Sequence, residues 1–523
     1  MRLLIFHYHD RPGGVREVIS RGLPLLLEWL DGVREIVFLT GELTDAAWRA
    51  DLEQRLGKFG KSGKIPLHWV ADPEWAYGGE DFKTLSPAST RRLWEFLKPP
   101  VRSGEGGRTV LWAHNLGIGR NIPLLRALPE LCLAAGAELW LHHHDWWWDG
   151  RWERWRDWRA AGVTSLDEAL AATVPVGPHI QHRCVNLADL PFLQNAAGAA
   201  ARWVGNPLPA FQRPAASEIR AARRWLDVRT GGRPAWLAPV RALRRKNLAE
   251  ALLLTRRLAP GACLVTTGGS SAAETPGWQQ FQAAAARRGW PLAPQVLAES
   301  GPDAPTVPAL MAAADTIVMT SLQEGFGLPW LEAAVLENPV ISRRLPDAVE
   351  NLGALGCRLS GTYDALPVPD GLFNPAAETA RLQLRWARAL SFLPDEFQGE
   401  TGAGPPKHES RGGTVRGAPA PSFSGSVPPD FGQLTLEGQL EVLAGNAADF
   451  PLPPGVQAQV PYWPCGSRRD FWAERFLSPD FPEPLSVSAI SSASWKSQSA
   501  EVRHRFHYWR RHPLLWPGPG GRT

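Results

Sequence analysis

Cysteine is scarce in this chain, with five copies spread over 523 residues. The five are Cys132, Cys184, Cys263, Cys357 and Cys465, and no two of them form a Cys-x-x-Cys pair. The sequence therefore indicates neither a disulfide framework nor a cysteine-based zinc site.

Long apolar runs are also missing. No run approaches the ~20 apolar residues that a membrane-spanning helix needs. The first run, Leu3-Leu4-Ile5-Phe6, is interrupted at once by His7, Tyr8, His9 and Asp10, which predicts a first β-strand and not a signal peptide. We expect a cytoplasmic protein, and peripheral association with a membrane stays open.

A strong charge of either sign is absent too. The formal net charge is +4, from 56 lysines and arginines against 52 acidic residues, and there is no lysine-rich block. Nucleic-acid binding needs a concentrated basic surface, so we expect no nucleic-acid partner. With 44% hydrophobic and 21% charged residues the composition is that of a globular protein. At about 150 residues per domain, the length predicts two domains and additional segments.

Apolar runs of strand length recur in both halves and alternate with longer amphipathic segments. We expect strands at residues 3–8, 35–40, 109–114, 138–142, 235–240, 262–267, 295–299, 316–320 and 340–342. We expect helices at residues 15–29, 122–135, 247–258, 306–314 and 329–336. This alternation predicts an α/β fold in which helices cover both faces of mostly parallel sheets.

Composition sets the domain boundaries. Residues 204–209 contain two prolines and a glycine, which predicts a crossing between domains at 1–205 and 206–397. Residues 398–430 are rich in Gly, Pro, Ser and Ala without a period, which is typical of a low-complexity linker or insertion. A tail at 431–523 follows, helix-like at 434–443 and rich in tryptophan at 471–516. The two doubly wound domains are expected to face each other across a central cleft.

The most informative segment is residues 320–333, TSLQEGFGLPWLEA, at the end of an expected strand. Gly325 and Gly327 allow the backbone to approach a ligand, and Pro329 suits the start of a helix. The amino end of that helix offers free N–H groups to an anion. Glu324 precedes the turn and Glu332 follows it, so both carboxylates can accept hydrogen bonds from sugar or ribose hydroxyls. Two solvated glutamates beside an ordinary turn are the alternative.

A basic run, RALRRKN at residues 241–247, follows the first strand of the second domain. Two cations at the start of a helix can neutralise a diphosphate and stabilise it as a leaving group. Arg241 and Lys246 are the candidates, although Arg244 or Arg245 could also reach a ligand. A solvated helix start is the alternative. In the first domain, Gly13-Gly14 follows the first strand, which is common in α/β proteins.

Histidines gather at the expected strand ends of the first half, at His7, His9, His114 and the run 142–144. His142 and His144 share one face of a strand, which would suit a metal ion. No cysteine and no further carboxylate except Asp145 stands at ligand spacing, so we expect no bound metal. Trp146, Trp147, Trp148, Trp152 and Trp155 could stack on a sugar acceptor, but packing inside the fold is favoured.

The segment from Glu324 resembles the Glu-x7-Glu signature, E-G-F-G-L-P-x-x-E-A, of the retaining family 4 glycosyltransferases, which have the GT-B fold of two Rossmann-like domains. In that family the first glutamate, here Glu324, contacts the transferred sugar, and the second, here Glu332, holds the ribose. Backbone amides of the intervening loop, here Gly325, Phe326, Gly327 and Leu328, contact sugar and phosphate. The family also has a glycine before the next strand, where this chain has Glu337-Asn338.

The resemblance extends to other positions. Arg241 and Lys246 match the spacing of the family's phosphate-binding cations, and Gly13-Gly14 matches a turn near the donor phosphate or the acceptor. His144-Asp145 resembles the family's His-Asp pair, and His114-Asn115 resembles a neighbouring strand end on the acceptor side. The family often ends with a helix that returns to the first domain, a role that the segment from Leu434 onward could take.

The resemblance implies transfer of a hexose-type sugar from a nucleoside diphosphate sugar, with retention of configuration and without a metal or other cofactor. Glu324, Arg241, Lys246, His144 and Asp145 are the expected catalytic residues. The acceptor could be a sugar, a lipid-linked molecule or another small molecule. A GT-B epimerase or phosphorylase, or a non-catalytic scaffold that binds partners through the tryptophan-rich tail, are the alternatives. The nucleotide base, the sugars, the linkage and the oligomeric state have no readable code in the sequence.

Overall fold

A computed structural model describes most of the chain. The described residues are 1–57, 65–78, 83–99, 107–207, 213–298, 301, 303–398, 428–463, 472, 476–477, 502, 505–506, 509 and 512–516. The expected linker at 398–430 lies outside them apart from its first and last residues, and so does most of the tryptophan-rich end. No helix in the described ranges combines the length and apolarity needed to cross a membrane.

The chain folds into two compact units. The N-terminal unit comprises Met1–Ala210, Phe392–Glu396 and Gly466–Phe506. The C-terminal unit comprises Phe211–Ser391, Phe397–Cys465 and His507–Thr523. The division after Ala210 lies five residues beyond the boundary expected at 205, and both units take residues from the C-terminal segment.

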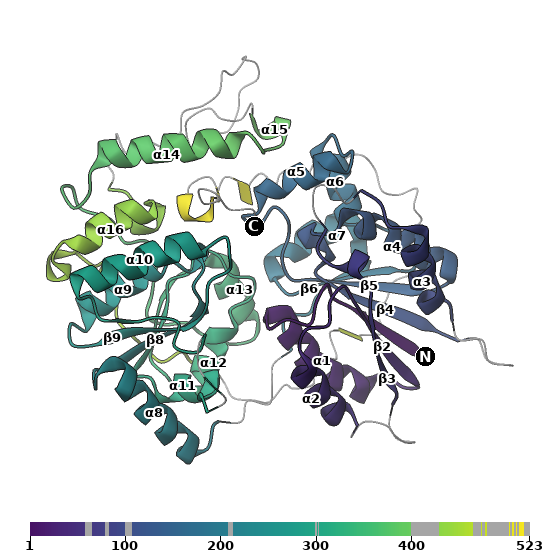
Figure 1. The fold of residues 1–523 in the computed structure, drawn as a ribbon, viewed down its shortest axis with the longest axis horizontal. Coiled ribbons are helices and arrows are strands. Elements are labelled where there is room, and N and C mark those ends of the chain that lie inside the picture. The colour runs from purple at the N-terminus through teal and green to yellow at the C-terminus, as the bar shows by residue number, and fades with distance from the viewer. Residues whose placement is uncertain are drawn as a thin grey trace. The chain divides into compact units, whose positions relative to one another are not determined.

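The N-terminal unit is built on a parallel sheet of seven strands in the order β3-β2-β1-β4-β5-β6-β7. Its strands are β1 (Arg2–Phe6), β2 (Glu35–Thr40), β3 (Leu67–Ala71), β4 (Thr109–His114), β5 (Glu138–His143), β6 (Ile180–Cys184) and β7 (Ala201–Trp203). Its helices are α1 (Gly14–Trp29), α2 (Ala46–Leu56), α3 (Pro87–Leu97), α4 (Ile122–Ala135), α5 (Trp155–Ala160), α6 (Leu166–Thr173) and α7 (Leu190–Ala197). Figure 1 shows these helices on both faces of the sheet.

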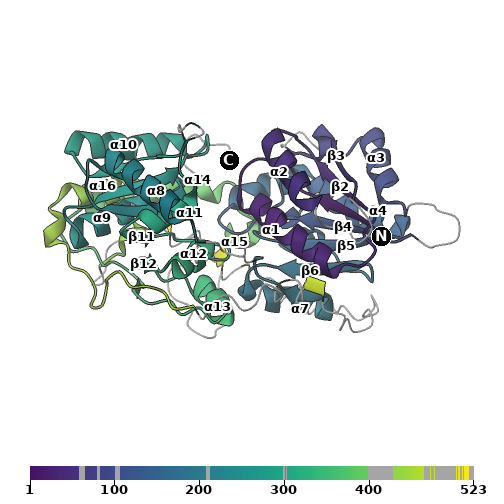
Figure 2. The same cartoon turned by 90° about the horizontal axis from the view of Figure 1, so that it is seen from below.

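The C-terminal unit repeats this plan with six parallel strands in the order β10-β9-β8-β11-β12-β13. Its strands are β8 (Ala235–Arg241), β9 (Cys263–Gly268), β10 (Leu292–Ala293), β11 (Thr316–Met319), β12 (Val340–Arg343) and β13 (Thr362–Tyr363). Its helices are α8 (Ala216–Thr230), α9 (Leu248–Leu258), α10 (Thr275–Arg288), α11 (Val307–Ala313), α12 (Leu328–Leu336), α13 (Pro346–Ala354), α14 (Pro375–Leu390) and α16 (Leu436–Ala444), while α15 (Asp395–Gln398) spans both units. Figure 2 shows the same layers turned by 90°.

One expected strand is wrong. Residues 295–299 were expected to pair, but the strand β10 lies earlier and residues 296–298 form a turn. Pro294 has no N–H to give to a ladder, and Gln295 adopts a left-handed φ of 50°. The Gln295 amide donates to Thr266 Oγ1 at 2.8 Å, and the Val296 and Leu297 amides bond to carbonyls of β9 from within the turn, without a regular ladder.

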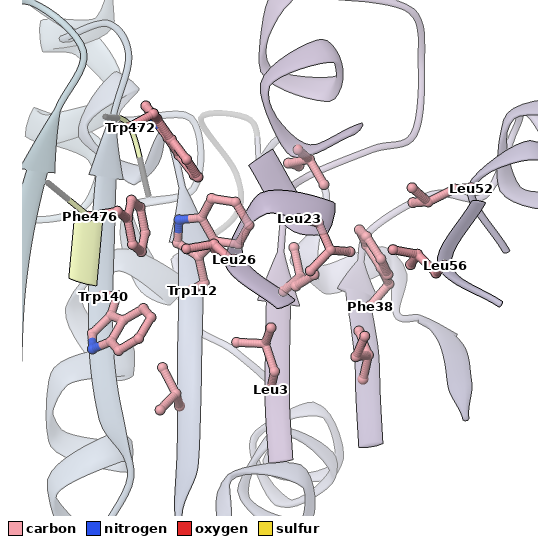
Figure 3. Close-up of a cluster of buried hydrophobic side chains, with 14 of the residues drawn as sticks. Leu3, Leu23, Leu26, Phe38, Leu52, Leu56, Trp112, Trp140, Trp472 and Phe476 are labelled. Carbon is pink, nitrogen blue, oxygen red and sulfur yellow. The ribbon is translucent and has the colours of Figure 1, made fainter. Parts of the chain in front are cut away.

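The C-terminal segment contributes to the core of the N-terminal unit. Trp472 and Phe476 are buried beside Trp112 of β4 and Trp140 of β5 (Figure 3). Helix α1 meets this segment at Gly22, where an added Cβ would lie 2.7 Å from the Trp472 ring. The absence of a side chain at Gly22 therefore makes room for the indole.

Arg183 of β6 holds the same segment in place. Its guanidinium donates to the Phe476 carbonyl at 3.1 and 3.0 Å and lies over the Trp140 and Phe476 rings. Burial and the nearby charge of Arg202 lower the pKa of Arg183 to about 9. A cation is thus retained in this apolar setting by carbonyl and aromatic contacts.

Candidate functional site

The candidate residues lie at equivalent places in the two sheets. Strand order reverses between β1 and β4 in the first sheet and between β8 and β11 in the second. Ligands of open parallel sheets bind beyond the carboxyl ends of strands at such a reversal. His7 follows β1 and His114 ends β4, whereas Arg241 ends β8 and Glu324 follows β11.

In the C-terminal unit the structure joins Lys246 and Glu324. The Lys246 ammonium forms a short ion pair with Glu324 Oε1, and the two side chains are only 9% and 11% exposed. Ser321 Oγ also donates to Glu324 Oε1, at 2.5 Å. The two predicted site residues, 78 positions apart in sequence, therefore form one buried polar cluster.

Arg245, which was only an alternative from the sequence, joins this cluster. Its Nη1 donates to the Gln323 carbonyl at 2.8 Å and lies 3.4 Å from Glu324 Oε2. Arg244 does not, since its Nε donates to Glu274 Oε2 at 2.8 Å. The basic run therefore divides into Arg245 and Lys246, which meet Glu324, and Arg244, which has a separate partner.

These cations keep Glu324 ionised. Burial by itself would raise the pKa of Glu324, but the charges of Lys246 and Arg245 and the hydrogen bond from Ser321 lower it below its ordinary value. A carboxylate in this state accepts hydrogen bonds and donates none. It is therefore suited to hydroxyl groups and unsuited to a second anion.

The loop after Glu324 has the geometry that its glycines predict. Gly327 has a φ of 103°, in which an added Cβ would approach the Trp330 ring to 3.0 Å. Helix α12 begins at Leu328 with Pro329 as its second residue, and Glu332 lies within its first turns. The Leu328 amide lies at the amino end of that helix, where a phosphate or sugar oxygen is favoured, whereas Pro329 has no N–H to offer.

Arg241 differs from the other cations. Its side chain is exposed, and it forms no ion pair with any described residue. Lys246, expected to open a helix, instead ends a 3-10 turn, η6 (Arg244–Lys246), and α9 begins two residues later. Thr320 at the end of β11 donates to the carbonyls of Lys246 and Asn247, each at 3.0 Å.

In the N-terminal unit, His114 and His144 are in direct contact. His114 Nδ1 lies 3.1 Å from His144 Nε2, and the His142 ring is tilted by 33° against that of His144 with the ring centres 4.6 Å apart. Burial lowers the pKa of His114 and His142 well below 6.5. It lowers the pKa of His144 to about 4, although Asp145 acts in the opposite direction. At neutral pH these imidazoles are uncharged.

Asn115 and Asp145 lie beside this pair with different roles. Asn115 adopts a left-handed φ of 59°, and its Oδ1 accepts from the Asp145 amide at 3.0 Å. Asn115 thus shapes the loop after β5. The carboxylate of Asp145 lies 3.4 Å from Arg151 and is 36% exposed, so solvent or a ligand can reach it.

Three of the histidines are close enough to surround a metal ion. One nitrogen from each of His114, His142 and His144 lies within 4.8 Å of the others. However, Trp112 Nε1 donates to His142 Nδ1 at 3.2 Å. In a neutral ring the proton is then on Nε2, so His142 has no free lone pair for a metal while that hydrogen bond lasts.

The tryptophan run packs inside the fold. Trp146, Trp147, Trp148, Trp152 and Trp155 are each no more than 1% exposed. Trp146 stacks on His143 with ring centres 4.4 Å apart, and Trp147 stacks on Trp155. Trp146 thus supports His143, and the five buried rings offer no face to a sugar.

Gly13 and Gly14 stand between β1 and the body of helix α1. Helix α1 begins at Gly14, and no described atom lies within 4 Å of a Cβ added at either position. Neither glycine is therefore required by packing. Their expected donor contact stays a prediction.

No protein-family model matches the chain. Mannosylglucosyl-3-phosphoglycerate synthase of Petrotoga mobilis is 24% identical over 381 residues, which cover 67% of this chain and 66% of that relative. The chain thus aligns with just under two thirds of the length of this curated relative.

Solved structures also match. Anabaena HepE in complex with UDP and glucose has a TM-score of 0.46 and 17% identity, over 67% of this chain and 82% of that one. WaaG, a glycosyltransferase involved in lipopolysaccharide biosynthesis, has a TM-score of 0.42 and 14% identity, over 69% and 86%. The sucrose-phosphate synthase of Thermosynechococcus elongatus has a TM-score of 0.41 and 14% identity, over 66% and 81%.

The predicted α/β fold class is confirmed: each unit is built on a parallel, doubly wound sheet of the Rossmann-like kind. This chain departs from the expected glycine before β12 without loss of the conformation. Glu337 adopts a left-handed φ of 60°, which glycine adopts at lower cost. The helix end is still closed, by the bond from the Asn338 amide to the Ala333 carbonyl at 2.9 Å.

A buried network beneath Lys246 had no signal in the sequence. Glu250 of α9 is 0% exposed, and Arg343 of β12 donates to both of its oxygens, at 2.9 and 2.5 Å. Arg343 also binds Asp430, at 2.7 and 3.0 Å. The three charges come from segments separated by up to 180 residues of sequence, so no local pattern could have indicated them.

Proposed function

We propose that this chain is a retaining, hexosyltransferase-type glycosyltransferase with a nucleoside diphosphate sugar as donor. The observation that carries the proposal is the buried cluster of Lys246, Arg245 and Glu324 at the strand reversal of the C-terminal sheet. It combines cations for a diphosphate with an ionised carboxylate for sugar hydroxyls. The name of the Petrotoga relative and the complex of HepE with UDP and glucose agree with such a donor.

Donor binding would exchange the partners within this cluster. Lys246 leaves Glu324 for the diphosphate, and Glu324 then accepts hydrogen bonds from the transferred sugar. Exposed Arg241 needs no such exchange and adds a second cation to the phosphates. Glu332 holds the ribose hydroxyls, and the amides of Gly325, Phe326, Gly327 and Leu328 hold sugar and phosphate oxygens. Desolvated cations favour the departing diphosphate in the transition state.

The acceptor belongs to the N-terminal unit in this proposal. His144 is neutral at physiological pH, so it can accept a hydrogen bond from an acceptor hydroxyl without carrying charge. Asp145 is accessible to a second hydroxyl. In a front-face reaction the C–O bond to the diphosphate breaks as the acceptor oxygen bonds the same face of the sugar. The leaving phosphate oxygen takes the acceptor proton, and no enzyme nucleophile is needed.

The test compares two buried ion pairs of the same unit. Glu324→Gln and Lys246→Ala are each expected to lower kcat/KM by at least about 100-fold, because a transition-state contact is removed. Glu274→Gln, in the Arg244–Glu274 pair, is the matched control and should keep near wild-type rates. Near wild-type rates in both Glu324→Gln and Lys246→Ala would overturn the proposal.

The assay begins with UDP-, GDP- and ADP-sugars and a panel of sugar, lipid-linked and small-molecule acceptors. A sugar linked to phosphoglycerate belongs among the first acceptors, after the name of the Petrotoga relative. Product from donor alone would favour an epimerase, and dependence on free phosphate would favour a phosphorylase. Nucleotide binding without turnover would favour a non-catalytic scaffold.

The reaction is proposed to need no metal. Addition of EDTA should leave the rate unchanged, and Zn²⁺ or Mg²⁺ should not raise it. Loss of activity in EDTA that returns with a divalent ion would contradict this. If the divalent ion restores activity to the wild type but not to the His114→Ala variant, the ion binds at the histidine cluster.

A further inference from the structure

Lys246 is followed by a residue in a strained conformation. Asn247 follows the 3-10 turn η6 and has a left-handed φ of 50° just before α9 begins. Asparagine tolerates this region better than most residues, but it still needs contacts that hold it there. Since Lys246 is its neighbour in the chain, the same contacts set the direction of the Lys246 backbone.

Those contacts come from both ends of the Asn247 amide. Nδ2 donates to Glu250 Oε2 at 2.7 Å, and Oδ1 accepts from Gln439 Nε2 at 2.9 Å. Gln439 Nε2 also donates to the Phe431 carbonyl at 3.0 Å, which identifies it as the amino group. Asn247, Glu250 and Gln439 are at most 2% exposed, so water does not compete for these bonds.

Glu250 and Gln439 are themselves fixed. Arg343 and the Tyr363 hydroxyl, the latter at 2.5 Å, hold the Glu250 carboxylate. Gln439 lies on α16, which lies beside α9 and α10 in both views (Figures 1 and 2). The segment from Asp430 to α16 therefore reaches the turn that carries Lys246 by two routes, through Arg343 and through Gln439.

We infer that Gln439 is a positioning residue for donor binding, which acts through Asn247 on Lys246. This rests on the proposed function, since Lys246 is taken to bind the donor diphosphate. The Asn247 amide can keep its bond to Glu250 only with its oxygen facing Gln439, so loss of the Gln439 donor leaves that oxygen buried without a partner. The turn then relaxes, and the Lys246 ammonium moves from the diphosphate position.

The experiment is a double-mutant cycle on the full-length protein. Dissociation constants for UDP, GDP and ADP are measured by calorimetry, and the tightest nucleotide is the probe. Gln439→Met keeps the volume but removes the donor, and it is expected to weaken binding about tenfold, within the usual range for contacting residues. Lys246→Ala is expected to weaken binding at least as much. In the double variant, Gln439→Met should add almost nothing to Lys246→Ala.

Two further variants separate positioning from general loss of stability. Val442→Ala lies on the same helix and is buried, but it has no bond to Asn247. It should lower Tm and leave nucleotide affinity unchanged. Asn247→Gly should bind more tightly than Asn247→Ala, because glycine adopts the left-handed φ without strain.

The outcomes distinguish failure of the proposed function from failure of the positioning role of Gln439. If no nucleotide binds, or if Lys246→Ala binds like the wild type, the proposed function fails. If Lys246→Ala weakens binding but Gln439→Met does not, or if the two losses simply add, the positioning role of Gln439 is wrong. A loss in Val442→Ala equal to that in Gln439→Met would also overturn it, because helix stability would then explain both.

Discussion

The two units place polar side chains at the same point of the same topology, but in opposite electrostatic forms. At the strand reversal of the N-terminal sheet, the buried groups are imidazoles that burial keeps neutral. At the reversal of the C-terminal sheet, and beneath it, the buried groups are charged and paired. A neutral imidazole suits a hydroxyl, whereas a cation held by an exchangeable carboxylate suits a phosphate.

The difference also predicts how each unit fails. A buried ion pair stabilises little overall, but removal of one partner leaves an uncompensated charge. A buried neutral histidine does not lower the stability of the fold at neutral pH. It lowers the free energy of unfolding once the pH is low enough that the unfolded chain binds a proton and the folded chain does not. The C-terminal unit should therefore be sensitive to single substitutions, and the N-terminal unit to acid.

The largest effect is expected from Arg343→Ala. This change leaves Glu250 and Asp430 buried together without their cation, which should lower the free energy of unfolding of the C-terminal unit by about 3–5 kcal/mol. This loss is measured by urea unfolding, monitored by hydrogen exchange of peptides from β8 and β9. Arg344→Ala is the control, because the Arg344 side chain is 51% exposed and its ion pair with Asp364, at 3.4 Å, lies at the surface. Equal losses in the two variants would remove the distinction between buried and surface pairs.

Acid should act mainly on the N-terminal unit. The pKa of His144 and of His182 falls to about 4 on folding, so each is neutral when folded and protonated when unfolded between about pH 6.5 and pH 4. Neither histidine lowers the free energy of unfolding above pH 6.5. As the pH falls below this value, each histidine lowers it, by about 2 kcal/mol at pH 5.

Two buried carboxyl groups oppose this trend, Asp149 and Asp189, because burial raises the pKa of each. Asp189 shares Arg505 with Asp149, and burial raises the pKa of Asp189 to about 6, so protonation relieves it as the pH falls. Five more histidines with lowered pKa values outnumber these two carboxyls: His7, His9, His114, His142 and His143. Hydrogen exchange at pH 7 and pH 5, corrected for intrinsic rates, should show β4 and β5 opening before β8 and β9. Equal protection losses in both sheets would contradict the assignment.

Local patterns predicted the framework well for a physical reason. Apolar periodicity is set by neighbours in sequence, and the structure has the strand at Thr109–His114 and the helix at Ile122–Ala135 where the pattern places them. Because parallel strands end at one edge of a sheet, strand-end residues such as Lys246 and Glu324 could be expected to meet. The sequence placed both residues after strands of the second domain, and the structure shows that their side chains are in direct contact.

The remainder depends on contacts without a local signal. The choice between Arg244 and Arg245 is set by the 3-10 turn η6 and by Glu274, neither of which the basic run specifies. Gln439 lies 192 residues from Asn247 and beyond a low-complexity segment. The burial of Trp146 and its neighbours, in contrast, agreed with the favoured interpretation, because apolar area usually decides where an indole lies.

The smallest effect on stability should come from Arg241→Ala, and this variant sharpens the comparison within the donor cluster. Arg241 is exposed and forms no ion pair with the described residues, so its loss should change the free energy of unfolding by no more than about 0.5 kcal/mol. Nucleotide affinity should nevertheless fall about tenfold, because a cation on the diphosphate is removed. Lys246→Ala should instead lower both quantities, since Glu324 is left buried without its main partner. Calorimetry and urea unfolding on both variants test this, and unchanged affinity in Arg241→Ala would leave Lys246 and Arg245 as the cations of the site.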